Sequence, residues 1–249
     1  MQDLLSNNGA LKADVERLTP AFNAATTKME TMLATELKAK TAYEGAQTEL
    51  NRLTENNKQL EATYNSANNA FNTVKQNYIA AQDNVQRLYD DANSRYTVIQ
   101  QLQSQYDTYS AAYKANSKDT AAYNSANNAA SQLNTLIPAY NTAYNNYSNA
   151  AAALDTQYNK TFMPAYNALQ TAATNLSNST DATNAYYNNT YTPLATDYSN
   201  VSKISMDYYN GSEYKNAVNP YITAYNSLQA STQETNDYYN GTFTNTQTA

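Results

Sequence analysis

Hydrophobic residues recur with one unbroken period over the first half of the chain. Starting at Leu11 and stepping alternately by four and three residues, the pattern reaches Tyr113 without a change of phase. Of the 30 positions on this path, 27 are apolar or aromatic, and the exceptions are Glu36, Asn57 and Arg95. A strict 3.5-residue repeat of this length is typical of a left-handed coiled coil. These 103 residues would span roughly 155 Å as a helix.

Large and small residues alternate along this stripe. The positions reached by a four-residue step carry bulky side chains such as Phe22 and Tyr43, and the others carry many alanines, such as Ala25 and Ala39. Large residues opposite small ones favour close antiparallel packing. Pro20 lacks a backbone N–H, so we expect it to limit the regular helix to the residues that follow, or to kink the first turns.

The segment YKANSKDTAAY (113–123) interrupts the stripe, and Ser117 or Asp119 could cap a new helix there. A second stripe is predicted after it, in a new phase. Its members are Tyr123, Ala126, Ala130, Leu133, Ile137, Tyr140, Tyr144, Tyr147, Ala151, Leu154, Tyr158, Thr161, Ala165, Ala168 and Ala172. A weaker helical pattern continues to Leu228.

Four prolines and a recurring short segment divide this second half. The prolines are Pro138, Pro164, Pro193 and Pro220, and the segments read YNKTF (158–162), YNNTY (187–191), YNGSEY (209–214) and YNGTF (239–243). Together they suggest a degenerate helical repeat of roughly 27 residues. We expect each proline to start a helix, and each segment to end one, with Gly211 and Gly241 as C-caps.

The fold class predicted from these patterns is all-α. We expect a long antiparallel coiled-coil hairpin or an elongated helical bundle, with residues 1–117 as the outgoing arm and 118–249 as the return arm of one elongated domain. A parallel homodimer through residues 11–113 remains open at this point, because a stripe does not name its partner.

Composition and charge exclude several classes of function. The chain contains no Cys and no His, so disulfides, Cys/His metal sites and cysteine or histidine catalysis are ruled out. A net charge of −6 without a basic run argues against nucleic acid as a partner. No apolar stretch approaches a membrane span, and residues 1–18 do not read as a signal peptide, so we expect an internal protein or a mature fragment. No cofactor and no metal are predicted.

The candidate sites are few. Asp90 and Asp91 are the sole adjacent acidic pair, and we interpret them as a solvated helix face, so we expect no enzyme. Three Tyr-Tyr-Asn clusters offer rigid rings beside adaptable amides, chemistry that suits a sugar or a protein partner. The alternative is that one Tyr of each pair packs in the helix seam. The clusters consist of Tyr186, Tyr187, Asn188, Tyr208, Tyr209, Asn210, Tyr238, Tyr239 and Asn240.

Eight Asn-x-Ser/Thr sequons follow residue 145, and none precedes it. They begin at Asn146, Asn159, Asn175, Asn178, Asn188, Asn200, Asn210 and Asn240. The abundance of Asn, Ser and Thr in this half explains them by chance. The alternative is a glycosylated exterior in a secretory or archaeal-type setting.

The Ala/Asn/Tyr/Thr-rich helices, with their YNSANNA and PAYNALQ phrases, resemble the helical stalk regions of Gram-positive cell-surface proteins, in particular those of lactic-acid bacteria. The resemblance implies an extracellular spacer or adhesive module, with self-association or a protein or glycan partner. Two further hypotheses come from other classes: a virion or phage-tail structural component, and a helical module that binds through the Tyr-Tyr-Asn clusters.

Overall fold

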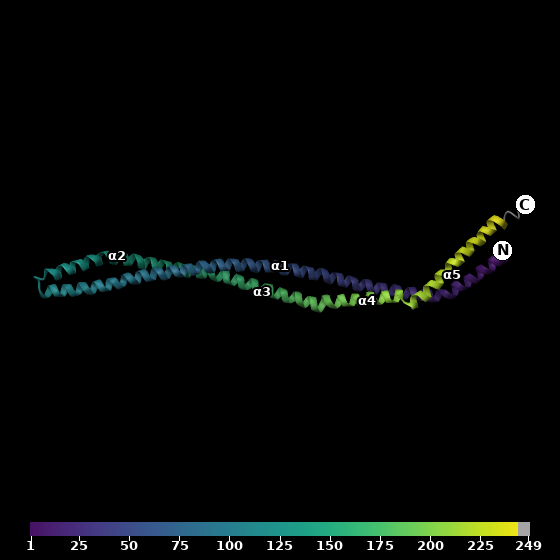
Figure 1. Ribbon diagram of the computed structural model, residues 1–249, viewed down its shortest axis with the longest axis horizontal. Coiled ribbons are helices and arrows are strands. Elements are labelled where there is room, and N and C mark those ends of the chain that lie inside the picture. Colours follow the sequence, from purple (N-terminus) through teal and green to yellow (C-terminus); the bar gives the residue numbers. More distant parts are fainter. Residues whose placement is uncertain (244–249) are drawn as a thin grey trace. The chain divides into compact units, whose positions relative to one another are not determined.

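A computed structural model describes residues 1–243, and every element in that range is helical (Figure 1), which confirms the all-α prediction. Three of the elements are short π-helical turns, designated η. The order is α1 (Gln2–Ala115), α2 (Thr120–Gln157), η1 (Tyr158–Phe162), α3 (Met163–Tyr186), η2 (Tyr187–Tyr191), α4 (Thr192–Asn210), α5 (Ser212–Asp237) and η3 (Tyr238–Phe243).

The chain divides into two compact units, and each contains part of both arms. The turn unit consists of residues 56–180, and the terminal unit consists of residues 1–55 and 181–249. In each unit, a stretch of α1 lies antiparallel to a stretch of the return arm. The antiparallel hairpin is therefore the observed arrangement, and its seam lies within a single chain.

The heptad stripe of α1 is the face that meets the return arm. Every position of the predicted stripe from Leu11 to Tyr113 is buried or half-buried, except Tyr109, which is 39% exposed. The most buried members are small or compact side chains: Ala25, Ala39, Ala46, Ala92 and Leu102. Small residues at these positions let the two helix backbones approach closely, which confirms the predicted large-and-small packing.

Pro20 does not limit or end the first helix. Helix α1 begins at Gln2 and continues through Pro20 without a break, so the expectation that regular helix starts after this residue is wrong. Proline at this position removes one backbone hydrogen bond. Its side chain faces solvent, where water can satisfy the carbonyl left without a partner, and the neighbouring Phe22 ring stacks on Tyr221 at 4.1 Å.

The two arms meet at residues 116–119. Of the two predicted caps, Asp119 is the one used: its Oδ1 accepts a hydrogen bond from the Ala122 backbone N–H at 2.9 Å. Asn116 Oδ1 accepts from the Lys118 backbone N–H at 3.2 Å. These bonds satisfy backbone groups that the ends of two helices would otherwise leave unpaired.

Aromatic contacts set the register of the turn unit. Moving back along α1 and forward along the return arm, Tyr113 contacts Tyr123, Tyr96 contacts Tyr140, Tyr89 contacts Tyr147 and Tyr78 contacts Tyr158, with ring centroids 5.1–5.8 Å apart. Each step back along α1 matches a step of equal length along α2. Such ring pairs contribute about 0.5–1.5 kcal/mol each beyond the apolar area they bury.

The predicted stripe of α2 is wrong at every second position. Tyr123, Ile137 and Tyr144, which the sequence pattern placed in the seam, are 48%, 41% and 51% exposed. The residues that face α1 lie one position earlier at those points. The observed stripe is Ala122, Ala126, Ala129, Leu133, Leu136, Tyr140, Ala143, Tyr147, Ala150 and Leu154. Bulky aromatic residues on α1 leave room for alanine opposite them, and Tyr123 and Tyr144 lie outside the seam.

The π-helical turns η1 and η2 are one-residue insertions in this heptad. After η1 the seam positions resume at Phe162, Ala165 and Leu169, one residue later than the α2 phase requires. After η2 they resume at Leu194 and Tyr198, again one residue late. The backbone N–H groups that follow η1 and η2 bond to carbonyls five residues back, the spacing of a π-turn. Each turn thus absorbs one extra residue and returns the next helix to the seam.

The predictions for the prolines and glycines are correct at some positions and wrong at others. Pro164 and Pro193 are the second residues of α3 and α4, as expected, but Pro138 and Pro220 lie inside α2 and α5. Gly211 is the C-cap of α4 in an extended conformation, with φ −71° and ψ 162°. Gly241 is not a C-cap of α5, because it lies within η3. A proline two residues after a π-turn suits that turn, since proline has no N–H to donate to the preceding carbonyls.

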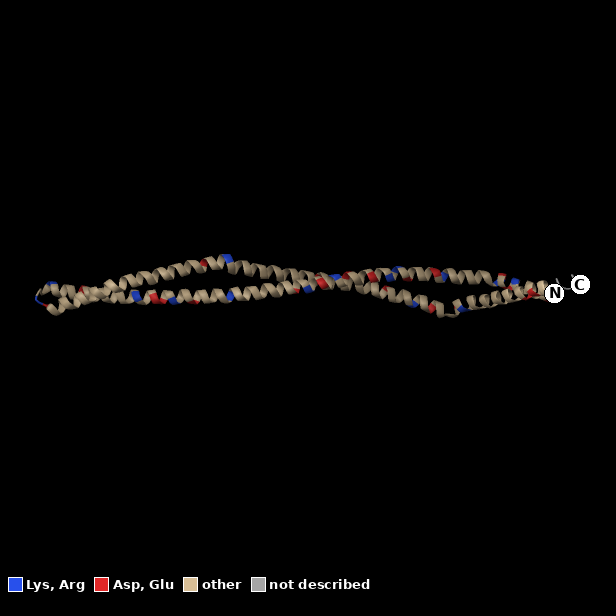
Figure 2. Cartoon of the chain, turned by 90° about the horizontal axis from the view of Figure 1, so that it is seen from above, with Lys and Arg blue, Asp and Glu red and all other residues tan. Residues whose placement is uncertain are grey.

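Charged residues are spread along the helices without a run of one sign (Figure 2). Most ion pairs join residues on the same helix, such as Arg52 with Glu49 at 2.6 Å. Lys28 with Glu213, at 2.7 Å, crosses from α1 to α5 in the terminal unit. Exposed pairs of this kind contribute little, so apolar and aromatic contacts in the seam hold the arms together.

Candidate functional site

The Tyr-Tyr-Asn clusters separate into inward and outward rings. Tyr186 is half-buried while Tyr187 is 48% exposed, and Tyr208 is 8% exposed while Tyr209 is 53% exposed. In the third cluster both rings face out, because Tyr238 is 36% and Tyr239 is 53% exposed. Asn188, Asn210 and Asn240 are all exposed. In the first two pairs one tyrosine therefore packs in the helix seam, as the alternative prediction stated. The other tyrosine of each of these pairs remains available at the surface.

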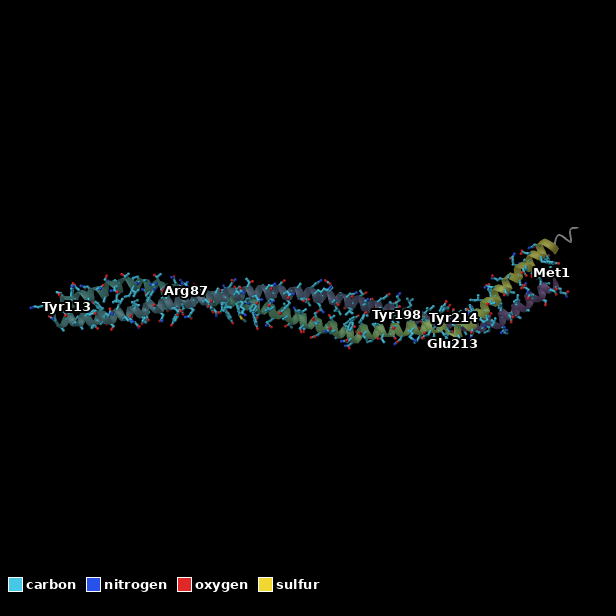
Figure 3. The ribbon with its side chains drawn as sticks, in the orientation of Figure 1. Met1, Arg87, Tyr113, Tyr198, Glu213 and Tyr214 are labelled. Atoms are coloured by element: carbon cyan, nitrogen blue, oxygen red, sulfur yellow. The ribbon has the colours of Figure 1, made fainter. Side chains whose placement is uncertain are left out.

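Tyr208 is part of the core of the terminal unit. Its hydroxyl donates a hydrogen bond to the Ala25 carbonyl at 3.3 Å, and the Lys28 ammonium lies 4.5 Å from the centre of its ring. Glu213 binds the same ammonium at the start of α5, where Figure 3 labels Glu213 and Tyr214. The hydrogen bond that Lys28 donates to Glu213 is the main cause that raises the pKa of Lys28 above its ordinary value.

The outward tyrosines share a local arrangement. Tyr158 stacks on Phe162 at 5.7 Å, Tyr187 stacks on Tyr191 at 5.6 Å, and Tyr209 contacts Tyr214 at 5.4 Å. We call Tyr158, Tyr187, Tyr209 and Tyr239 the outer tyrosines, since each opens one Tyr-Asn-x-Ser/Thr segment. We call Phe162, Tyr191 and Tyr214 the inner aromatic residues.

The inner aromatic residues are held by the seam. Phe162 contacts Phe71 and Tyr78 of α1 at 5.4 and 5.0 Å. Tyr191 lies 5.7 Å from the Tyr43 ring, and the two hydroxyl oxygens are 3.3 Å apart. That hydrogen bond, with burial as a second cause, raises the pKa of Tyr191 above its ordinary value. Phe162 and Tyr191 are therefore held by aromatic rings of α1, and each limits the movement of the outer ring that stacks on it.

A shallow groove of about 330 Å³ opens at η2 beside this pair. Its lining consists of Tyr187, Tyr191, Thr192, Ala195, Thr196, Ser199 and Asn200. No lining residue carries a charge, and the polar groups are hydroxyls and one amide. The chemistry available here is stacking on a ring with hydrogen bonds beside it, and it contains no acid, base or nucleophile pair.

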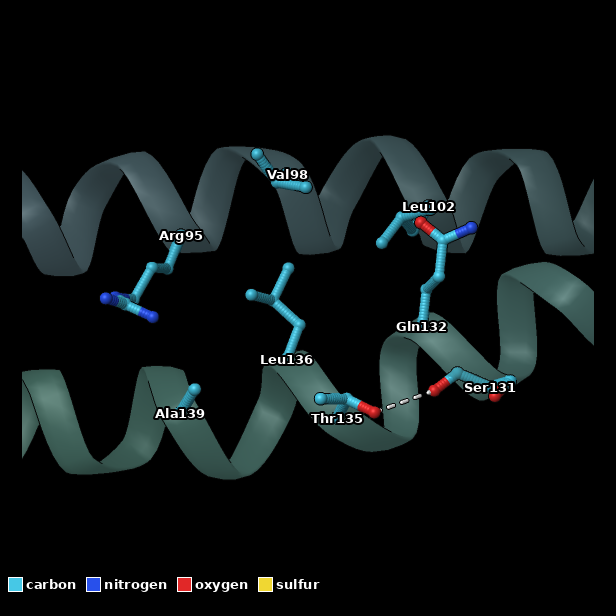
Figure 4. A pocket seen from close by; sticks show the side chains of 8 residues that line it. All are labelled: Arg95, Val98, Leu102, Ser131, Gln132, Thr135, Leu136 and Ala139. Atoms are coloured by element: carbon cyan, nitrogen blue, oxygen red, sulfur yellow. Dashed lines mark hydrogen bonds between the residues drawn. The ribbon is translucent and has the colours of Figure 1, made fainter.

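A larger groove of about 510 Å³ lies between α1 and α2 in the turn unit (Figure 4). Val98, Leu102 and Leu136 form its apolar part. The cation at its edge is already neutralised, because Arg95 Nε donates to both carboxylate oxygens of Asp91 at 3.1 Å. This groove thus lacks a free charge to select an anionic ligand.

The remaining sequence candidates lie on solvated faces. Asp90 and Asp91 are both exposed, and Asp90 accepts a hydrogen bond from Gln86 at 2.9 Å, which agrees with the interpretation of a solvated helix face. All eight sequon asparagines are exposed as well, so their modification stays a prediction. In residues 1–243 no cluster of three metal-ligating side chains is found. Within the described helices, none is long and apolar enough to span a membrane.

Sequence reasoning missed one outer tyrosine and all the inner aromatic residues as parts of a site. Tyr158 escaped because Gln157 precedes it, so no Tyr-Tyr pair marks it. The signal that finds all four outer tyrosines is the recurring segment itself, Tyr-Asn-x-Ser/Thr with an aromatic residue close behind. That segment coincides with the three π-turns and with the break at Gly211.

In each unit the described residues form an all-α pair of antiparallel helices, with exposed tyrosines that contact other aromatic rings. A scan against protein-family models and searches of curated proteins and of solved structures give no significant match to the chain. The function is therefore argued from the geometry of the chain's own residues.

Proposed function

We propose that this chain is a non-enzymatic structural and interaction protein, an extracellular helical stalk or adhesin segment. The observation that carries the proposal is that, in each unit, the described helices bury one face against each other and enclose no site. In each unit, residues of α1 and of the return arm bury a stripe of side chains against each other, and no side chain among the described residues is less than 2% exposed. In such a helix pair most residues add length and exposed surface, and few remain to enclose a site.

The surface that results supports an interaction role. Tyrosines provide much of it, and several large side chains, including Tyr209 and Tyr239, are about half exposed. Exposed aromatic residues beside amides and hydroxyls are typical of recognition surfaces. The low share of charged residues, 14%, gives this surface little electrostatic selectivity.

Size-exclusion chromatography with in-line small-angle X-ray scattering tests the spacer role. We expect a monomer with a maximum dimension of about 150 Å, from the rise of an α-helix over the heptad stripe. A dimer of that length would add self-assembly to the function. A compact particle under about 80 Å would contradict the proposal, because a particle of that size lacks the length that a spacer needs.

Labelling of intact cells separates this proposal from the virion alternative. An antibody raised against the purified chain should bind the surface of unpermeabilised source cells, and protease treatment of those cells should remove the signal. Labelling confined to purified virus particles would contradict the cell-surface assignment and favour a virion or phage-tail component.

A further inference from the structure

We propose that the outer tyrosines are stacking platforms for a neutral polysaccharide, with the asparagine that follows each ring supplying hydrogen bonds. This inference deepens the proposed interaction role and rests on it. It assigns recognition to Tyr158, Tyr187, Tyr209 and Tyr239, and it removes Tyr186 and Tyr208 from the contact surface.

The first argument is preorganisation. Each ring is 38–53% exposed, and three of the four rest on an inner aromatic residue that is itself fixed by other aromatic rings. A ring that is already held in place loses little conformational entropy when a ligand stacks on it. Tyrosine is well suited to this use, because it offers a large contact area with only two side-chain torsions.

The second argument is the chemistry beside the rings. A tyrosine face carries negative electrostatic potential, which attracts the polarised C–H groups on the flat face of a sugar ring. Hydroxyl and amide groups line the groove beside Tyr187. They can donate hydrogen bonds to sugar hydroxyls and accept hydrogen bonds from them. Asn159 is held at the first platform by hydrogen bonds to Asp155, through its backbone oxygen at 3.0 Å and its carboxylate at 3.3 Å.

The third argument is charge, which selects a neutral ligand. The groove at η2 has no charged lining residue. Near Tyr209, Lys203 pairs with Asp207 at 2.8 Å and Glu213 pairs with Lys28 at 2.7 Å, so the charges there compensate each other. The whole chain carries a net charge of −6, which disfavours anionic polysaccharides.

The fourth argument is repetition. Within the terminal unit, Tyr187 and Tyr209 are 22 residues apart, which corresponds to about 33 Å of helix axis. Separate platforms with the same Tyr-Asn-x-Ser/Thr chemistry suit a polymer that repeats one sugar. A protein partner would instead need one contiguous interface of roughly 800 Å² on each side. Weak binding at each platform would add up through effective concentration along the polymer.

Affinity gel electrophoresis of the full chain tests the proposal. The gels contain a soluble mannan, a β-glucan or a galactan as the neutral probes, and polygalacturonate as the anionic control. We expect at least one neutral polysaccharide to retard the wild-type chain. Replacing all four outer tyrosines by alanine should raise the apparent Kd at least about tenfold, because the stacking surface and the avidity are both lost.

A matched control variant also loses four exposed tyrosine rings. It carries Tyr109→Ala, Tyr144→Ala, Tyr166→Ala and Tyr225→Ala, at positions that are 39–51% exposed and outside the Tyr-Asn-x-Ser/Thr segments. We expect its apparent Kd to change by less than about twofold. A variant with phenylalanine at all four outer positions keeps the rings and should still be retarded. Far-UV circular dichroism checks that each variant remains helical.

Three outcomes would overturn the inference: no retardation by any neutral probe, equal loss of binding in the control and outer-tyrosine variants, or retardation by polygalacturonate alone. Binding of the wild-type chain to itself or to a protein in place of the probes would assign these rings to a protein interface. The scattering experiment above measures length without any ligand, so the stalk proposal stands or fails independently of these results.

Discussion

The outgoing helix α1 keeps one heptad phase along its entire stripe, whereas the return arm changes phase at η1 and at η2. Both arms bury a 3.5-residue stripe against the other, yet only the return arm carries the extra residues. The difference shows that a helix can absorb an insertion locally and remain in the seam. It also shows where the absorbed residues go, because each insertion places a Tyr-Asn pair on the surface.

Local sequence explains why the return arm tolerates these turns. A proline follows η1 and η2 by two residues, at Pro164 and Pro193, so the carbonyls before it lack an α-helical donor in any case. The aromatic residue that ends each of these turns, Phe162 or Tyr191, then packs on α1. The aromatic contact offsets the backbone hydrogen bond that is lost at each turn. Helix α1 contains no such turn and needs no such contact.

Deleting a single residue from a regular α-helix or from a π-turn should give the largest difference in stability. Deleting Asn141 from regular α2 rotates the following residues by about 100°, so that Ala143, Tyr147 and Leu154 leave the seam. We expect the free energy of unfolding to fall by at least about 3 kcal/mol. Deleting Asn189 from η2 should convert that turn to α-helix with the seam intact, at a cost within about 1 kcal/mol.

Thermal and urea denaturation followed by circular dichroism measures both deletions. Both residues are exposed asparagines on the return arm, so the comparison is matched in chemistry and burial. Equal destabilisation by the two deletions would show that η2 is not an absorbed insertion.

Truncation at two positions compares Leu133, which both possible stripes of α2 contain, with Ile137, which only the predicted stripe contains. Leu133 is 6% exposed and Ile137 is 41% exposed. We expect Leu133→Ala to lower the free energy of unfolding by about 2–3 kcal/mol, because it leaves a cavity in the seam. Ile137→Ala should cost less than about 1 kcal/mol. Chemical denaturation checks this, and a larger effect at Ile137 would restore the phase predicted from the sequence.

Hydroxyl removal distinguishes the inward from the outward ring of one Tyr-Tyr pair. Tyr208→Phe removes the hydrogen bond to the Ala25 carbonyl, with an expected loss of about 0.5–1.5 kcal/mol. Tyr209→Phe should leave the free energy of unfolding unchanged within about 0.3 kcal/mol. Denaturation of the two single variants measures the difference. If the two variants lost the same stability, Tyr208 would have no special place in the core.

The smallest effect concerns alkaline pH in the terminal unit. Interactions with Tyr43 raise the pKa of Tyr191, and Glu213 raises the pKa of Lys28. A raised pKa means that the folded state binds the proton more tightly than the unfolded state. Stability from these groups is therefore complete below about pH 10 and decreases as pH rises through the folded pKa values.

Spectroscopic titration of tyrosine absorbance checks this prediction. One tyrosine in the wild-type chain should ionise later than the bulk, and Tyr191→Phe should remove that late step. Tyr187→Phe serves as the control on the same turn. A late step that persists without Tyr191 would place the perturbed group elsewhere.

Several features of the fold could be read from the chain directly. The stripe from Leu11 to Tyr113 defines α1 because 27 of its 30 positions are apolar or aromatic, which leaves one face to bury. Asp119 marks the start of α2 through its short acceptor side chain, and Gly211 marks a helix end. The Tyr-Tyr-Asn clusters identified two of the inward–outward ring pairs, but not which chemistry the outward rings serve.

The phase of the return stripe could not be derived from its own residues. Ala122 and Tyr123, Leu136 and Ile137, and Ala143 and Tyr144 are adjacent apolar residues, so hydrophobicity favours both phases equally. The choice depends on the opposite helix, because tyrosines at the bulky positions of α1 leave space for alanine rather than for a second large ring.

The sequence by itself determined an all-α chain, one long amphipathic helix, the position of the turn and the recurrence of the Tyr-Asn-x-Ser/Thr segment. These follow from local periodicity and capping, which need no partner. Only the tertiary structure decided which α2 face is buried, that three of the four recurring segments form π-turns rather than helix ends, and which tyrosine of the first two Tyr-Tyr pairs points outward. Those outcomes depend on steric fit between two helices, and that fit exists only once both arms are placed side by side.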